Sequence, residues 1–297
     1  MRPADFVDPF EGRPGVFHLA SDHLESMHLF SDEESFRYGV NTLALGVARF
    51  KVSLYCYELM DSHLHVLVGG VWPECRSFIQ WVLHRLAMMI SRRDGVSNIL
   101  SRDGFDVHAV LDSRQFRNEV AYILRNCYKA RICSPFSYEW GSIDVYFNPR
   151  RDYLPGTPVS ALGTVEIRRM FQTRVEMPQR YEVWEGRILN RCFVDYSYVE
   201  RQFGDSLSFF DILRKWDLES SVALSHGVSE QIIFSDAELS ARLQTLCRKD
   251  YGADSVRSLD RKSLLLLARS ASRRFGAGKS QLARLLNLSA DALEKVL

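Results

Sequence analysis

Two histidines separated by one residue form the stretch of this sequence best suited to chemistry. The run Met60–Val68 reads MDSHLHVLV and has the apolar, β-branched character of a strand. Because side chains two residues apart in a strand point to the same face, His63 and His65 would present their imidazoles side by side. Two adjacent imidazoles can bind one divalent metal ion. The alternative is a pair of surface histidines on an open sheet face.

A tyrosine further along the chain lies on a helix that we predict over residues 113–131. The apolar residues of this helix form one stripe at helical spacing: Phe116, Val120, Ile123, Leu124, Cys127 and Ala130. At about 100° per residue, Tyr122 falls opposite that stripe. Asn126 lies one turn later on the same side, and Glu119 and Lys129 share this face. One group of the Tyr122–Asn126 pair could attack a substrate while the other completes a metal site. The alternative is an exposed tyrosine on a polar helix face.

The elements that must position these residues follow the order β-α-β-β-α-β. We predict strands over 15–21, 52–60, 63–68 and 105–110, with helices over 32–50 and 73–93. Ser31 and Glu34 have the spacing of a capping box for the first helix. The order is that of the ferredoxin-like split βαβ fold, a four-stranded antiparallel sheet with helices on one face. We therefore expect an α+β protein in which this domain is followed by an all-α C-terminal region.

The length of 297 residues favours two domains. Turn residues cluster over 149–164, where we expect the first domain to end. The predicted organisation is a domain over 1–150, a helical linker region over 151–235 and a helical module over 236–297.

The composition is that of an ordinary globular protein, with 46% hydrophobic and 25% charged residues. We see no apolar run of membrane-spanning length and no signal peptide, and so expect no membrane partner and a cytoplasmic, nucleoid-associated location. A net charge of +1 argues against a protein that coats DNA non-specifically. The six cysteines form no C-x-x-C pair, which favours reduced thiols over a zinc site.

The C-terminal stretch Lys279–Leu297 (KSQLARLLNLSADALEKVL) resembles a helix-turn-helix, with Ser289 as the N-cap of its second helix. Residues 248–284 contain ten lysines and arginines against three acids, which supports DNA contact. Candidate contacts here are Arg273, Arg274 and Lys279. The alternative is a generic helical hairpin.

The histidine stretch, the Tyr122 helix and the residues that follow this helix resemble the single-tyrosine HUH transposases, in particular the REP-associated tyrosine transposase-like branch. That family has a run close to L-M-P-N-H-x-H-hydrophobic, and Leu59–Leu67 reads LMDSHLHVL. It also has Y-I-x-x-N-P on a later helix, and Tyr122–Cys127 reads YILRNC, 122 − 65 = 57 residues after the second histidine. Pro135–Ser142 (PFSYEWGS) resembles the end of the family domain. The match covers roughly residues 10–150, with these three segments in the family's order.

The resemblance implies a metal-dependent DNA endonuclease and strand transferase. His63, His65 and Asn126 would be ligands of Mg²⁺ or Mn²⁺, and Tyr122 would be the nucleophile that forms a 5′-phosphotyrosine link. The substrate would be single-stranded or hairpin DNA, acted on by a monomer or a homodimer. Side chains that could contact this DNA are Trp72, Trp81, Arg85, Arg92, Arg93, Arg125 and Lys129. The alternative is a buried aromatic stripe with a solvated basic face, which is the favoured interpretation for Trp81.

The sequence also departs from the family pattern. Asp61 and Ser62 replace the proline-asparagine before the first histidine, Cys127 replaces the proline after the asparagine, and Asp22 stands near a position where many members have arginine. The first change alters the turn that aims His63, and the second alters how the helix continues. These departures motivate an alternative function, a domesticated, non-catalytic protein that binds DNA sequence-specifically.

Overall fold

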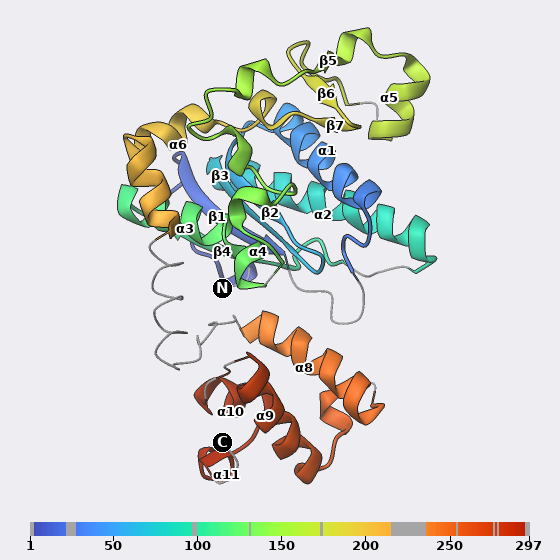
Figure 1. The fold of residues 1–297 in the computed structure, drawn as a ribbon, viewed down its shortest axis with the longest axis vertical. Helices are drawn as coiled ribbons and strands as arrows, with labels where there is room; N and C mark the ends of the chain where they lie inside the picture. The colour runs from blue at the N-terminus through green and yellow to red at the C-terminus, as the bar shows by residue number, and fades with distance from the viewer. Residues whose placement is uncertain are drawn as a thin grey trace. The chain divides into compact units, whose positions relative to one another are not determined.

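The structure, a computed structural model, describes residues 3–21, 28–96, 100–130, 132–172, 175–214, 236–253, 255–275, 277 and 279–294. The described residues up to Leu213 form one compact unit, and the described residues from Arg214 onward belong to a second. Figure 1 shows the elements of each unit. None of the described helices is long and apolar enough to cross a membrane.

The first unit is built around a four-stranded antiparallel sheet. Its strands are β1 (Gly15–Ser21), β2 (Ser53–Leu59), β3 (Leu64–Gly70) and β4 (Phe105–Val110), in the order β2-β3-β1-β4. The β-α-β-β-α-β order expected from the sequence is the order found over these residues. Strand alternation divides the side chains between two faces, so that Leu19 and Val66 point to one face and His18 and His65 to the other.

Two long helices, α1 (Glu33–Arg49) and α2 (Trp72–Asp94), lie side by side against one face of the sheet (Figure 1). The predicted cap of α1 was wrong by one residue. The N-cap is Asp32, whose carboxylate accepts the backbone N–H of Ser35 at 2.8 Å, while the Ser35 hydroxyl completes the capping box. A carboxylate at this position also stabilises the positive end of the helix dipole.

The opposite face of the sheet is covered as well, by α3 (Ser113–Ile123) and α4 (Asn126–Lys129). The Phe116 ring of α3 packs edge-on against Tyr55 of β2, and Glu119 of α3 reaches His18 of β1. The expectation of helices on one face only, with the other face open, was therefore wrong. The apolar stripe of α3 is buried on the sheet, which leaves the histidines of that face in the interior.

The single helix predicted over 113–131 is interrupted at Leu124 and Arg125. The cause is a change of hydrogen-bond partners. The backbone N–H of Cys127 donates to the Glu58 carboxyl on β2 at 2.5 Å instead of continuing the helical ladder. The Asn126 side-chain amide donates to the carbonyls of Tyr122 and Ile123, at 3.2 and 3.0 Å, and so satisfies acceptors that the break exposes.

Residues 151–213 pack as part of the first unit, whereas the sequence predicted a helical linker from residue 151. They contain the helices α5 (Thr164–Phe171) and α6 (Tyr196–Phe203) and a small antiparallel sheet of β5 (Thr157–Pro158), β6 (Glu182–Trp184) and β7 (Arg187–Ile188). Asn41 of α1 hydrogen-bonds Gly186 O and Ile188 N. A buried amide needs such partners, so this segment completes the burial of α1.

The second unit contains the helices α8 (Asp236–Tyr251), α9 (Arg261–Phe275), α10 (Lys279–Leu286) and α11 (Ala290–Glu294). Leu243, Leu267, Ala271, Leu282 and Leu293 lie in its core. The Ser289 hydroxyl accepts the N–H of Ala292 at 3.3 Å, as expected for the N-cap of α11. Short 3₁₀ helices elsewhere span Pro3–Asp5, Pro135–Ser137, Ile143–Val145, Arg151–Tyr153, Val159–Ala161, Asn190–Cys192 and Val256–Ser258.

Candidate functional site

His63 and His65 lie next to each other at the beginning of β3. His63 directly precedes the strand, and its ring centroid is 4.7 Å from that of His65, with the two rings nearly perpendicular. Both side chains are buried, with only 4% and 5% of their surface exposed. The alternative of two surface histidines is therefore wrong, and the predicted pairing of the imidazoles is confirmed.

Each of the two imidazoles has a hydrogen-bond partner at its Nδ1 atom. His63 Nδ1 is 3.0 Å from the Ser62 hydroxyl, and His65 Nδ1 is 3.0 Å from His18 Nε2. Such partners hold a ring in one orientation and direct its other nitrogen toward a ligand position. Ser62, one of the departures from the family pattern, thus orients His63 through its hydroxyl.

Tyr122 lies beside His65, near the end of α3. Its ring centroid is 5.8 Å from that of His65, at an interplanar angle of 89°, and 5.7 Å from that of His18. Lys129 of α4 places its Nζ atom 3.4 Å from the centroid of the Tyr122 ring. The tyrosine is half-buried, and the structure brings it together with the histidine pair and a positive charge.

Asn126 is positioned by the break between α3 and α4. Its side chain is 2% exposed and its Nδ2 atom is held by two backbone carbonyls. Its Oδ1 atom is buried and accepts no hydrogen bond from any described residue. Leaving a buried amide oxygen unsatisfied costs about 1–3 kcal/mol. A cation bound at this oxygen would remove that cost.

An imidazole is a donor that suits transition-metal ions, and an amide oxygen is a donor that suits Mg²⁺ and Mn²⁺. No cluster of three or more His, Cys, Asp or Glu side chains that could hold a metal occurs among the residues described. A metal bound by His63 and His65 would therefore need a further ligand of another type, and Asn126 is the one that the sequence predicted.

Glu58 lies under the start of α4 and was not anticipated from the sequence. It pairs with His65 in the β2–β3 register, so both side chains belong to the same face of the sheet. Burial raises the pKa of Glu58 to about 8, against the opposing effect of the Cys127 hydrogen bonds. The carboxyl is therefore mostly neutral at pH 7, and it anchors Cys127, the residue next to Asn126.

His18 and Glu119 also belong to this site. His18 could have been found by strand alternation, because residues 15–21 were predicted as a strand. Glu119 shares the polar side of α3 with Tyr122. What no local pattern indicates is that β1 neighbours β3, which brings His18 to His65.

Several residues predicted to contact DNA are used inside the protein. Arg85 is 9% exposed, donates to the carbonyl of Phe171 at 2.6 Å and stacks over Tyr38 and Trp81. It lies on α2, which packs against the sheet face opposite to the histidines, so its side chain is engaged by partners inside the first unit. Arg125 is also buried, at the break before α4.

The other aromatic and basic candidates are distributed over several elements. Trp72 packs against Phe6 and Phe17. Arg92 hydrogen-bonds Gln172, and Arg93 contacts Asp94 and the carbonyl of His28.

In the second unit, Arg274 is 3.5 Å from Asp250 and Lys279 is 3.3 Å from Glu294, and both basic side chains are exposed. The side chain of Arg273 lies outside what the structure describes.

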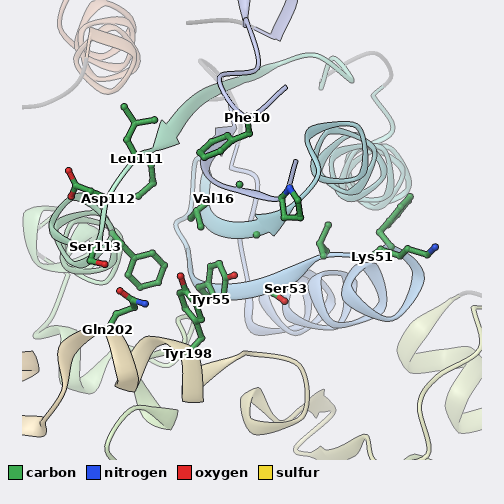
Figure 2. A pocket seen from close by; sticks show the side chains of 18 residues that line it. Phe10, Val16, Lys51, Ser53, Tyr55, Leu111, Asp112, Ser113, Tyr198 and Gln202 are labelled. Atoms are coloured by element: carbon green, nitrogen blue, oxygen red, sulfur yellow. The ribbon is translucent and has the colours of Figure 1, made fainter. Parts of the chain in front are cut away.

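A pocket of about 640 Å³ lies at the other end of the sheet, where β1 and β2 begin and β3 ends. Figure 2 shows Tyr55, Tyr198, Phe10 and Lys51 among its lining side chains. None of His63, His65, Tyr122 and Asn126 lines it. The pocket is therefore separate from the histidine site.

No protein-family model matches the chain, and no curated protein matches it. Among solved structures, the chain is similar to a REP-associated tyrosine transposase bound to a REP hairpin. The two have 12% sequence identity, the similarity covers 44% of this chain and 78% of that chain, and the TM-score is 0.38. The similarity is distant, so the chemistry of the site has to be judged from its own side chains.

Proposed function

We propose that the first unit is a ferredoxin-like HUH domain that cleaves and rejoins single-stranded or hairpin DNA through a 5′-phosphotyrosine intermediate. The observation that carries this proposal is the gathering of Tyr122 with the buried His63–His65 pair. The buried Oδ1 atom of Asn126 supports it as well, because this oxygen has no hydrogen-bond donor among the described residues and could accept a metal ion.

In this function Tyr122 is the nucleophile. Its phenolic oxygen attacks the phosphorus of a phosphodiester, the bond from phosphorus to the 3′-oxygen breaks, and the 3′-oxygen takes up a proton as a hydroxyl. The phosphate stays linked to the tyrosine, so a later 3′-hydroxyl can reverse the reaction without an external energy source. A divalent metal held by His63, His65 and Asn126 would neutralise charge on a non-bridging phosphate oxygen.

The chain's own residues prepare the nucleophile in two ways. A phenol ordinarily loses its proton near pH 10, and the ammonium of Lys129 above the Tyr122 ring favours the negative charge that develops as the proton leaves. The rings of His65 and His18 pack against Tyr122 and restrict the positions of its side chain. Restricting a nucleophile in this manner lowers the entropic cost of attack.

The test is formation of a covalent protein–DNA adduct on a labelled hairpin oligonucleotide in the presence of Mn²⁺. The wild-type protein should form the adduct, and Tyr122→Phe should not. Tyr153→Phe is the matched control, since Tyr153 is an exposed tyrosine of the same unit. An adduct that persists in Tyr122→Phe would remove Tyr122 from the reaction.

A second candidate function is sequence-specific DNA binding without catalysis, which would use the second unit. The exposed Arg274 and Lys279 near α10 and the Ser289-capped α11 favour it. This function predicts tight binding to one sequence that neither EDTA nor Tyr122→Phe weakens. Cleavage of any hairpin oligonucleotide by the wild-type protein would rule it out.

A further inference from the structure

Three buried or partly buried side chains from three different elements form a continuous hydrogen-bonded line that ends at His65. Glu119 Oε2 of α3 is 2.8 Å from His18 Nδ1 of β1. His18 Nε2 is 3.0 Å from His65 Nδ1 of β3. His18 is 4% exposed and the Glu119 side chain 22%. A line of this kind fixes the positions of protons as well as the orientation of rings.

We propose that Glu119 and His18 are positioning residues that hold His65 in the tautomer with its proton on Nδ1, so that Nε2 presents its lone pair to the metal. The inference rests on the proposed function, because it assigns a role to residues behind one of the proposed metal ligands. Glu119 and His18 are thereby added to the proposed site as residues that act through His65 and would not themselves contact the metal or the DNA.

The direction of the line follows from the carboxylate. An ionised carboxylate only accepts hydrogen bonds, so the His18 nitrogen that faces it, Nδ1, carries a proton. In a neutral imidazole the other nitrogen, Nε2, is then an acceptor. The nitrogen that faces it, His65 Nδ1, must therefore donate. The remaining nitrogen of His65, Nε2, carries the lone pair that a metal requires.

The charge state of Glu119 agrees with this direction. Burial by itself would raise the pKa of Glu119, but the hydrogen bond from His18 and the nearby positive charge of Lys129 lower it below its usual value. The carboxyl is thus ionised at neutral pH. Glu119 also precedes Tyr122 by one turn of α3. The Glu119–His18 contact therefore also holds in place the helix that carries the nucleophile.

His108 provides a matched control on the same sheet face. It stands directly opposite His18 in the β1–β4 register, with its ring centroid 6.1 Å from that of His18. It is solvent-exposed and has no place in the line from Glu119 to His65. Replacing His108 changes the packing and polar contacts beside His18 without interrupting that line.

The experiment combines two measurements on the full chain. Nitrogen-15 NMR of histidine-labelled, metal-free protein reports which nitrogen of His65 carries the proton. Calorimetric titration with Mn²⁺ reports the dissociation constant. Both are measured for the wild type, Glu119→Gln, His18→Leu and His108→Gln, and circular dichroism confirms that each variant is folded. Glu119→Gln retains the shape of the side chain and keeps the test informative if His18→Leu does not fold.

The expected result is an Nδ1-protonated His65 in the wild type and in His108→Gln. The amide of Glu119→Gln can either accept a hydrogen bond from His18 or donate one to it, so a mixture of His65 tautomers is expected in that variant, and loss of the single tautomer in His18→Leu. Mn²⁺ binding should weaken about 10- to 100-fold when this support is lost. An Nε2-protonated His65 in the metal-free wild type, or unchanged Mn²⁺ affinity in both variants, would overturn the inference. A wild type that binds no Mn²⁺ would instead overturn the proposed metal site, while the tautomer still decides the role of Glu119 and His18.

Discussion

Glu58→Gln should change the way in which the stability of the first unit depends on pH. Glu58 is 2% exposed, and burial raises its pKa from 4.5 to about 8. The folded state therefore holds the proton more tightly than the unfolded chain does. The contribution of this carboxyl to stability is complete below pH 4.5 and is lost progressively as the pH rises toward 8.

The size of the effect follows from the shift in pKa. One pKa unit corresponds to about 1.4 kcal/mol, so ionising Glu58 in the folded state costs about 5 kcal/mol in full. Between pH 4.5 and pH 7 the loss amounts to about 3 kcal/mol. Glutamine has nearly the same shape, can still accept the N–H of Cys127 through its amide oxygen and does not titrate. The free energy of unfolding of Glu58→Gln, relative to the wild type, should rise by about this amount over that range.

The measurement is urea unfolding followed by tryptophan fluorescence at several pH values. Trp72, Trp81, Trp140 and Trp184 lie in the first unit and report on it. Glu166→Gln serves as the control, because Glu166 is an exposed glutamate of the same unit. If the difference in the free energy of unfolding between Glu58→Gln and the wild type stays constant from pH 4.5 to pH 7, the argument that burial holds Glu58 neutral is refuted.

Two further predictions concern the nucleophile and the sheet. Lys129→Met should slow adduct formation by about 2- to 30-fold, because a cation over an aromatic ring contributes about 0.5–2 kcal/mol. Lys129→Arg keeps the positive charge and should retain most of the rate. Equal rates for Lys129→Met and the wild type in a single-turnover assay would exclude Lys129 from the reaction. Gly69→Ala should destabilise the first unit by about 1–3 kcal/mol, since a Cβ there would lie 2.3 Å from the Tyr55 hydroxyl.

Local periodicity was sufficient to identify the central part of the site. The alternation of side chains along the extended chain at the start of β3 brings His63 and His65 together. The helical spacing of residues 113–123 turns Tyr122 away from the apolar stripe. Both patterns depend on the geometry of a single element, which neighbouring residues determine. For the same reason the strand limits of β1 and β4 agree with those expected from the sequence.

Contacts between elements were the part that could not be predicted. The helix over 113–131 was expected to be continuous because its apolar residues recur at helical spacing throughout. It breaks because Cys127 meets Glu58 of a strand 69 residues earlier in the chain. Arg85 looked like a surface arginine on a helix, yet the carbonyl of Phe171 and the rings of Tyr38 and Trp81 enclose it. In both cases the contacting residues lie far apart in the sequence, and the periodicity of a single element does not indicate such contacts.

The sequence by itself therefore determined the order of the elements, the histidine pair and the position of Tyr122 on its helix. Only the tertiary structure decided that α3 covers the histidine face, that His18 and Glu119 stand behind His65, and that Asn126 Oδ1 is buried without a hydrogen-bond donor among the described residues. The physical reason is that a side chain's direction within an element follows from backbone geometry. Its partners depend on which elements pack together, which the burial of the whole chain decides.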